Sequence, residues 1–121
     1  MHKLIALAVL FASSAVAHDA VLTWEHPTEY DDGQPLPVTD IRETRVEYGR
    51  CVEQAFPAQP EGTLVVPGPA ASVGIVGLTN GWWCFRAFTV STEGVESDPS
   101  GTAVAHYVGK PKPPSNLVAA Q

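Results

Sequence analysis

Two cysteines and four histidines are the residues of this sequence with the widest range of chemistry. In a cytosolic enzyme, Cys51 and Cys84 would more often be a metal pair or supply a nucleophile. In an exported chain of this size they most simply form one disulfide, and two free buried thiols are the alternative. The interpretation of the cysteines therefore depends on the compartment.

Residues 1–17 have the three parts of a secretory signal peptide. Residues 1–3 are a short basic start, residues 4–12 are an unbroken apolar run, and Ala15-Val16-Ala17 is a small-x-small cleavage signal. The apolar run is shorter than the roughly 20 residues that span a bilayer. A buried N-terminal helix is the alternative. We expect a secreted or periplasmic mature chain that begins at His18 and has no membrane span.

Cleavage after Ala17 would make His18 the N-terminal residue. An amino-terminal histidine is half of a copper-binding brace, which also needs a second histidine in space. His26 and His106 are the candidates for that role, but no His-x-His or methionine-rich ligand set accompanies them. We therefore expect no cofactor, and His18 is the residue on which a copper alternative would depend.

The motif Asp31-Asp32-Gly33 offers carboxylates for calcium. It lacks the alternating oxygen ligands of a calcium loop, so it predicts a turn with solvated carboxylates. Hydrolysis by paired carboxylates would need two acids in one pocket, and strand parity places no such pair inward. The sequence has no Gly-x-Ser-x-Gly motif, Ser/His/Asp spacing or phosphate loop. We expect no catalysis.

The composition predicts about one domain with many turns, because the chain has 121 residues with ten Gly and eleven Pro. Only 17% of the residues are charged, and 13 acidic residues outnumber 7 basic ones. A surface for nucleic acid or for an anionic membrane needs clustered positive charge. The charge balance therefore argues against a nucleic-acid partner.

The apolar residues repeat with a period of two, which is typical of strands. Thr44, Val46 and Tyr48 share one face of a half-buried strand, and Trp83 and Phe85 take the inward parity of a long strand over residues 82–89. Further strands are expected at residues 21–24, 63–66, 72–76 and 102–108, with turns between them. Six or so short strands without a helix of ten residues describe a β-sandwich.

Five short motifs in this order resemble a fibronectin type III domain of the kind found in small exported proteins of bacteria and their phages. The resemblance covers about residues 20–108. The motifs are Val21-Leu22-Thr23-Trp24 followed by Pro27, Asp32-Gly33-x-Pro35-Leu36, Arg45-Val46-x-Tyr48-Gly49, Gly77-Leu78-x-x-Gly81 leading into Cys84-Phe85-Arg86-Ala87, and Glu96-Ser97-x-Pro99-Ser100.

The resemblance implies an all-β, immunoglobulin-like sandwich of about seven strands. It makes Trp24 and Tyr48 core residues of the second and third strands and Leu78 the plug before the sixth. Phe85 is a core residue of that sixth strand by its inward parity. Trp83 stands where the family usually has the tyrosine whose hydroxyl ties a corner of the fold. An indole N–H can donate but cannot accept, which puts this corner bond in question.

The family topology also bears on the cysteines, because its third and sixth strands are antiparallel neighbours. Cys51 follows the third strand in the outward parity of Arg45 and Glu47, and Cys84 shares the outward parity of Trp82. Both cysteines would emerge at the same end of one outer face. The resemblance thus implies a Cα separation within the range of a disulfide.

The sequence departs from the family pattern at both ends of the domain. A mature chain that begins at His18 has only three residues before Val21, so the first strand is absent or very short. Residues 110–121 resemble the linker and first strand of a following domain. One hypothesis is that this tail pairs with the open edge of the next subunit. The alternative, which we favour, is a loose Pro-rich end on a monomer.

The expected outer face of the sheet mixes aromatic and arginine side chains of the sort enriched in protein contacts. Trp82, Arg86 and Phe88 project there beside Arg45. The alternative is structural, with Trp82 covering part of the disulfide and Phe88 packing under the polar loop that follows. If the face is a binding site, its partner is a protein or a cell-surface glycan.

We therefore expect a signal peptide at residues 1–17, a fibronectin type III-like domain at residues 18–109 and a Pro-rich tail at residues 110–121. The expected function is that of an exported, non-catalytic binding, adhesion or spacer module, with a phage-encoded origin among those the resemblance implies. The alternatives are a structural assembly protein built by tail donation and a small periplasmic copper binder.

Overall fold

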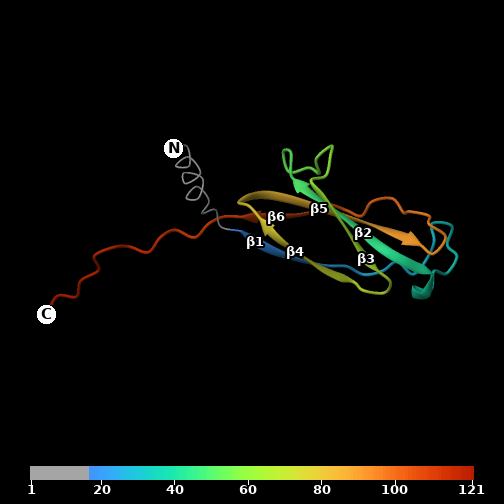
Figure 1. Ribbon diagram of the computed structural model, residues 1–121, viewed down its shortest axis with the longest axis horizontal. Coiled ribbons are helices and arrows are strands. Elements are labelled where there is room, and N and C mark those ends of the chain that lie inside the picture. The colour runs from blue at the N-terminus through green and yellow to red at the C-terminus, as the bar shows by residue number, and fades with distance from the viewer. Residues whose placement is uncertain (1–16) are drawn as a thin grey trace, which may run out of the picture.

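The computed structural model describes residues 17–121, so the predicted signal peptide lies outside the described residues except for Ala17. Within residues 17–121, no helix is long and apolar enough to cross a membrane. The elements are β1 (His18–Thr23), the 3-10 helix η1 (Val38–Asp40), β2 (Ile41–Arg50), β3 (Gly62–Pro67), β4 (Ser72–Leu78), β5 (Gly81–Ser91) and β6 (Ala103–Tyr107) (Figure 1).

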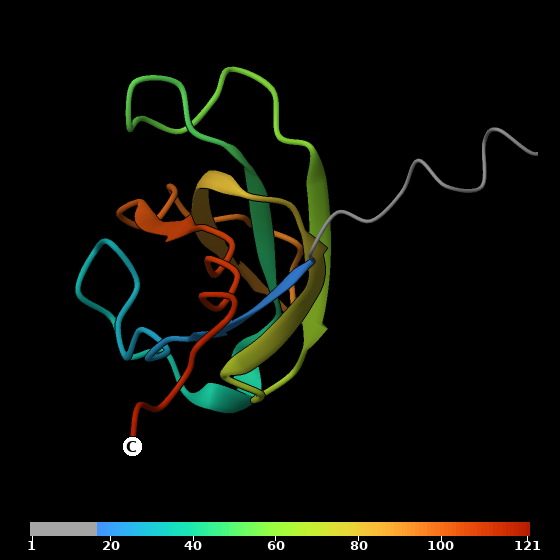
Figure 2. The same cartoon turned by 90° about the vertical axis from the view of Figure 1, so that its left-hand side faces the viewer.

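The strands form two antiparallel sheets, which confirms the predicted all-β sandwich (Figures 1 and 2). One sheet has four strands in the order β3-β2-β5-β6, and the other has only β1 and β4. All of the strands expected from the period-two pattern are present, with bounds that differ by a few residues. The described residues thus give six strands, against the figure of about seven that the resemblance implied.

The alternation predicted for β2 is confirmed by burial, whereas β5 is buried on both sides, with the outward Cys84 and Phe88 as buried as the inward Phe85. Thr44 and Val46 are buried on the inner face of β2, whereas Arg45 and Glu47 are only partly buried and point outward. Cross-strand register pairs Glu47 with Arg86 on β5, so the outward residues of the two strands lie beside each other. The four-stranded sheet therefore has an apolar inner face and a mixed outer face.

The core lies between the two sheets and contains several residues expected there. Leu78, Trp83 and Phe85 belong to the buried cluster, and the half-buried Tyr48 packs against it. Trp24, which was expected in the core, is not part of the buried cluster. β1 ends at Thr23, one residue before Trp24, and the backbone N–H of Trp24 donates to the carbonyl of Ala71. The Trp24 side chain is half-buried beside the sandwich core, and its indole N–H has no acceptor.

Trp83 makes the corner bond that the sequence put in question. Its indole Nε1–H donates to the backbone carbonyl of Thr79 at 2.8 Å, four residues upstream. The guanidinium of Arg50 lies over the indole ring, with 5.2 Å between its central carbon and the ring centroid. The bond needs only a donor from the side chain, so an indole fixes this corner as a hydroxyl would.

The disulfide between Cys51 and Cys84 is present, with a Cα separation of 5.2 Å. Cys84 lies opposite Gly49 in the register of β2 and β5, and Cys51 follows the end of β2. The backbone N–H of Cys51 also donates to the carbonyl of Trp82 at 3.0 Å. The bridge therefore extends the pairing of the two central strands at one end of the outer face.

Replacing both cysteines, Cys51→Ala with Cys84→Ala, should lower the free energy of unfolding by about 3 to 4 kcal/mol. The physical reason is that the bridge closes a loop whose ends are 33 residues apart and so restricts the unfolded chain. Urea unfolding followed by tryptophan fluorescence measures the change. As a control, a reducing agent should destabilise the parent protein and leave the double variant unaffected; equal unfolding midpoints for parent and variant would contradict the account.

Candidate binding face

The outer face of the four-stranded sheet is built from strands in register, and the predicted binding residues lie on β2 and β5, with β3 beyond β2 and β6 beyond β5. β5 contributes its outward residues, which lie opposite outward residues of β2 on one side and of β6 on the other. The pairs across the face are Arg45 with Phe88, Glu47 with Arg86, Gly49 with Cys84, Val104 with Cys84, and His106 with Trp82. The four residues expected to bind a partner therefore do lie on one face.

Arg86 is held by a carboxylate and by two aromatic rings. Its Nε and Nη2 atoms both lie 2.9 Å from Oε1 of Glu47. The guanidinium carbon lies 4.0 Å from the ring centroid of Phe56, which comes from the loop between β2 and β3, and 5.4 Å from that of Phe88. The charge of Arg86 is thus paired within the domain and its faces are covered.

Arg45 fixes the loop after β5 in a similar way. Its Nη1 atom lies 2.7 Å from Oε2 of Glu96 in that loop, and its Nη2 atom lies 3.7 Å from Oε2 of Glu47. The guanidinium stands 4.5 Å above the ring of Phe88, which is only 8% exposed. Three of the four residues predicted to bind are therefore engaged within the domain: Arg45 and Arg86 both lie over Phe88, and each also contacts a loop residue.

Trp82 is the member of the predicted patch that stays open to solvent, with 44% of its surface exposed. Its indole is stacked on the imidazole of His106, with ring centroids 4.0 Å apart and parallel planes. Val104, also 44% exposed, is next along the outward side of β6. We call Trp82, His106 and Val104 the aromatic platform.

The sequence could not assign His106 and Val104 to this platform. Outward parity in residues 102–108 is visible in the sequence, but the register of β6 against β5 is not. A flat aromatic surface of this kind can stack on the apolar face of a sugar ring or on an aromatic or guanidinium side chain. The platform offers a flat contact area to such a partner.

The loops at the far end of the domain from the tail form an acidic pocket of about 480 Å³. Its lining includes Glu29, Asp31, Glu96 and Asp98 together with Tyr30. Loss of hydration is the main cause that raises the pKa of Tyr30 above its ordinary value. Nearby negative charges raise it further, with the largest effect from Asp40, then Glu93, then Asp32. This end of the molecule therefore carries a strong negative potential.

The motif Asp31-Asp32-Gly33 is a turn within this acidic end, as its composition predicted. Oδ1 of Asp32 accepts a hydrogen bond of 2.9 Å from the backbone N–H of Gln34. Gly33 has a φ of 87°, a left-handed conformation that favours glycine. Among residues 17–121, no group of three or more His, Cys, Asp or Glu side chains is arranged to hold a metal ion.

The histidines weighed for copper have different neighbours. The ring of His18 stacks on Tyr107 at 5.2 Å, and its Nε2 atom lies 2.7 Å from Oδ1 of Asn80. His26 directs Nε2 to the carbonyls of Pro69 and Ala70, while His106 stacks on Trp82. Within residues 17–121, the partners of the His18 ring are therefore Tyr107 and Asn80, and neither His26 nor His106 is among them.

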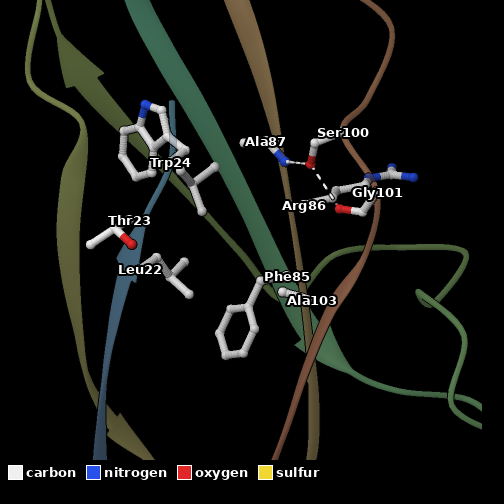
Figure 3. A pocket seen from close by; sticks show the side chains of 10 residues that line it. Leu22, Thr23, Trp24, Phe85, Arg86, Ala87, Ser100, Gly101 and Ala103 are labelled. Carbon is white, nitrogen blue, oxygen red and sulfur yellow. Dashed lines mark hydrogen bonds between the residues drawn. The ribbon is translucent and has the colours of Figure 1, made fainter. Parts of the chain in front are cut away.

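A smaller pocket of about 240 Å³ opens between β1 and the β5–β6 side of the sandwich (Figure 3). Leu22 and Trp24 line it from the β1 side, and Phe85, Ala87 and Ala103 line it from the other side. The lining is mostly apolar, and the polar contacts beside it are made within the chain: Oγ of Ser100 accepts from the N–H of Ala87. We call this the seam pocket.

Comparison of this chain with protein-family models and with curated proteins found no match to either. The function is therefore argued from the side chains and pockets described above.

Glu47 is the shared acceptor of the outer face, so Glu47→Gln should lower the free energy of unfolding by about 1 to 3 kcal/mol. Only 13% of its side chain is exposed, and the change removes the carboxylate that Arg86 pairs with and that Arg45 shares, so that Arg45 keeps only Glu96. Chemical denaturation measures the effect. The matched control is Glu43→Gln, which loses a pair with the half-exposed Arg42 and should cost less than about 1 kcal/mol. Equal losses in the two variants would show that Glu47 does not organise the face.

Proposed function

We propose that this protein is an exported, non-catalytic binding module of the fibronectin type III kind, which serves adhesion or spacing through the aromatic platform. The observation that carries the proposal is the exposed Trp82–His106 stack on the outer face of the four-stranded sheet. The motifs that resemble the family, and the six-strand sandwich in which they lie, support the assignment to this kind of module.

The aromatic platform, rather than the arginine-rich part of the face, is the proposed contact. Arg45 and Arg86 already have carboxylate partners within the domain, so a new partner would have to compete with those pairs. The Trp82 indole has no such competitor on its open side, where 44% of its surface is accessible. Aromatic anchors near the centre of a contact commonly supply most of its binding energy.

The surroundings of the aromatic platform are rigid, which favours binding. Trp82 lies near the start of β5, paired with His106 of β6 on one side, while on the other side its carbonyl accepts from the N–H of the disulfide-bonded Cys51. A preorganised surface loses little conformational entropy when it meets a partner. The stack with His106 also holds the indole in one orientation before contact.

The proposed partner is a neutral cell-surface glycan or a protein that presents apolar or basic groups. Aromatic rings stack on sugar faces and on guanidinium groups. The chain has a formal net charge of −6, which disfavours polyanions such as nucleic acid. A disulfide and the predicted leader at residues 1–17 support a location outside the cytoplasm, where such a surface is met.

Trp82→Ala should reduce retention of the protein on intact bacterial cells and on an array of neutral glycans at least tenfold, which is about 1.4 kcal/mol of binding free energy. The thermal midpoint should change little, because Trp82 is 44% exposed and lies outside the buried core cluster. Retention is measured by quantitative pull-down and array fluorescence, and the midpoint by calorimetry.

The matched control is Val76→Ala, which trims a 77% exposed apolar side chain on the two-stranded sheet and should not alter retention. Trp82→Phe should keep part of the retention, since a ring remains to stack on His106. Unchanged retention by Trp82→Ala, or a collapse of its fold, would overturn the assignment of the aromatic platform as the contact surface.

A further inference from the structure

The strand β1 has a free edge in the described part of the chain. It pairs with β4 on one side, and residues 17–121 supply no strand on its other side. Alternate residues of an edge strand direct their N–H and C=O groups away from the sheet. Such an edge is a template to which another extended segment can add.

The seam pocket lies beside this free edge and not beside β4. Its lining includes Leu22, Thr23 and Trp24 from the β1 segment but no residue of β4. Across the pocket lie Val46 and Phe85, which belong to the buried inner face of the four-stranded sheet. A strand added to β1 would therefore gain backbone hydrogen bonds and could also place an apolar side chain against the core.

The C-terminal tail has the properties of such a strand. Residues 108–121 form no strand or helix, and all of them are exposed. Leu117 is 90% exposed and Val118 is 81% exposed, which is unfavourable for apolar side chains unless they are covered. A short run of small and apolar residues, 117–120, follows a Lys-Pro-Lys-Pro-Pro stretch.

The direction of the tail indicates that it reaches a second copy and not its own β1. The tail leaves the domain after Tyr107, which stacks on His18 at the start of β1. Antiparallel addition to β1 would require the added strand to enter at Thr23 and run toward His18. To reach that end of its own β1, the tail would have to turn back along the length of the strand, about 20 Å. Its first residues are Pro-rich and therefore stiff, and Figure 1 shows the tail extending away from the domain.

Charge complementarity favours the same arrangement. Residues 17–109 carry thirteen carboxylate side chains and four arginines, a formal side-chain charge of −9, and eight of the carboxylates lie in residues 25–40 and 93–98. These loops form the end of the domain where β1 finishes, opposite the end from which the tail departs (Figure 1). The tail has two positive side chains, Lys110 and Lys112, and no acidic ones.

We infer that the tail of one copy, residues 110–121, adds its segment 115–121 as an antiparallel strand to β1 of a second copy, with Leu117 in the seam pocket. Lys110 and Lys112 then lie at the acidic loop end of the recipient, because the linker of an antiparallel donor enters there. Each copy offers one tail and one free edge, so the contact is head-to-tail and extends into open chains of subunits.

Sedimentation velocity of the full chain over a wide range of protein concentration tests this inference. The mean mass should rise with concentration, whereas a variant lacking residues 110–121 should stay at the mass of one copy. That variant should fold, since the tail residues are exposed throughout and contribute nothing to the core. High salt should weaken the association by screening Lys110 and Lys112.

Two matched substitutions test the fit of the tail. Leu117→Asp should abolish association because it would bury a charge in the seam pocket, while Val118→Asp should preserve it because the next side chain along a strand points to the other face. Trp82→Ala should associate like the parent, which separates this inference from the proposed binding function. A full chain that stays at the mass of one copy, or equal loss by both tail variants, would overturn the inference.

Discussion

The two sheets are unequal in size, so two strands have to cover the apolar inner face of a four-stranded sheet. The rest of the structure depends on this difference in area. β1 and β4 supply Ala20, Ile75 and Leu78, which cover Phe85 and its neighbours in the buried cluster. On the β1 side the cover ends at the seam pocket, so part of the apolar interior lies near the surface. The energy from burial between the sheets is correspondingly limited.

The outer face adds a disulfide, ion pairs and ring contacts to the core, and most of its predicted binding residues are engaged in them. Cys84 is fully buried on the outward side of β5, and Phe88 is nearly so beneath Arg45. Glu47 joins the two arginines, while Glu96 brings a loop onto the sheet. Of the predicted binding residues on this face, Trp82 is the one that stays exposed, and it is held by its stack with His106.

The sequence was sufficient for the strands, for their inward and outward residues and, with the family resemblance, for the disulfide. Alternation in β2 and β5 depends on local parity, which a single sequence displays. The sequence could not show that Arg45, Arg86 and Phe88 are engaged within the domain. The partners Phe56 and Glu96 come from loops, and the sequence has no periodic pattern that predicts where a loop runs. The contact of His106 with Trp82 likewise depends on the register of β6, which is fixed only by three-dimensional pairing.

Among the described residues of a single copy the edge of β1 is open, and the tail of a second copy would cover it. Amide hydrogen exchange of the full chain, measured by NMR at low and high protein concentration, tests this directly. The account predicts that alternate amides of β1 exchange much faster than those of β2 in dilute solution and become protected as concentration rises. Equal protection of β1 and β2 at both concentrations would contradict it.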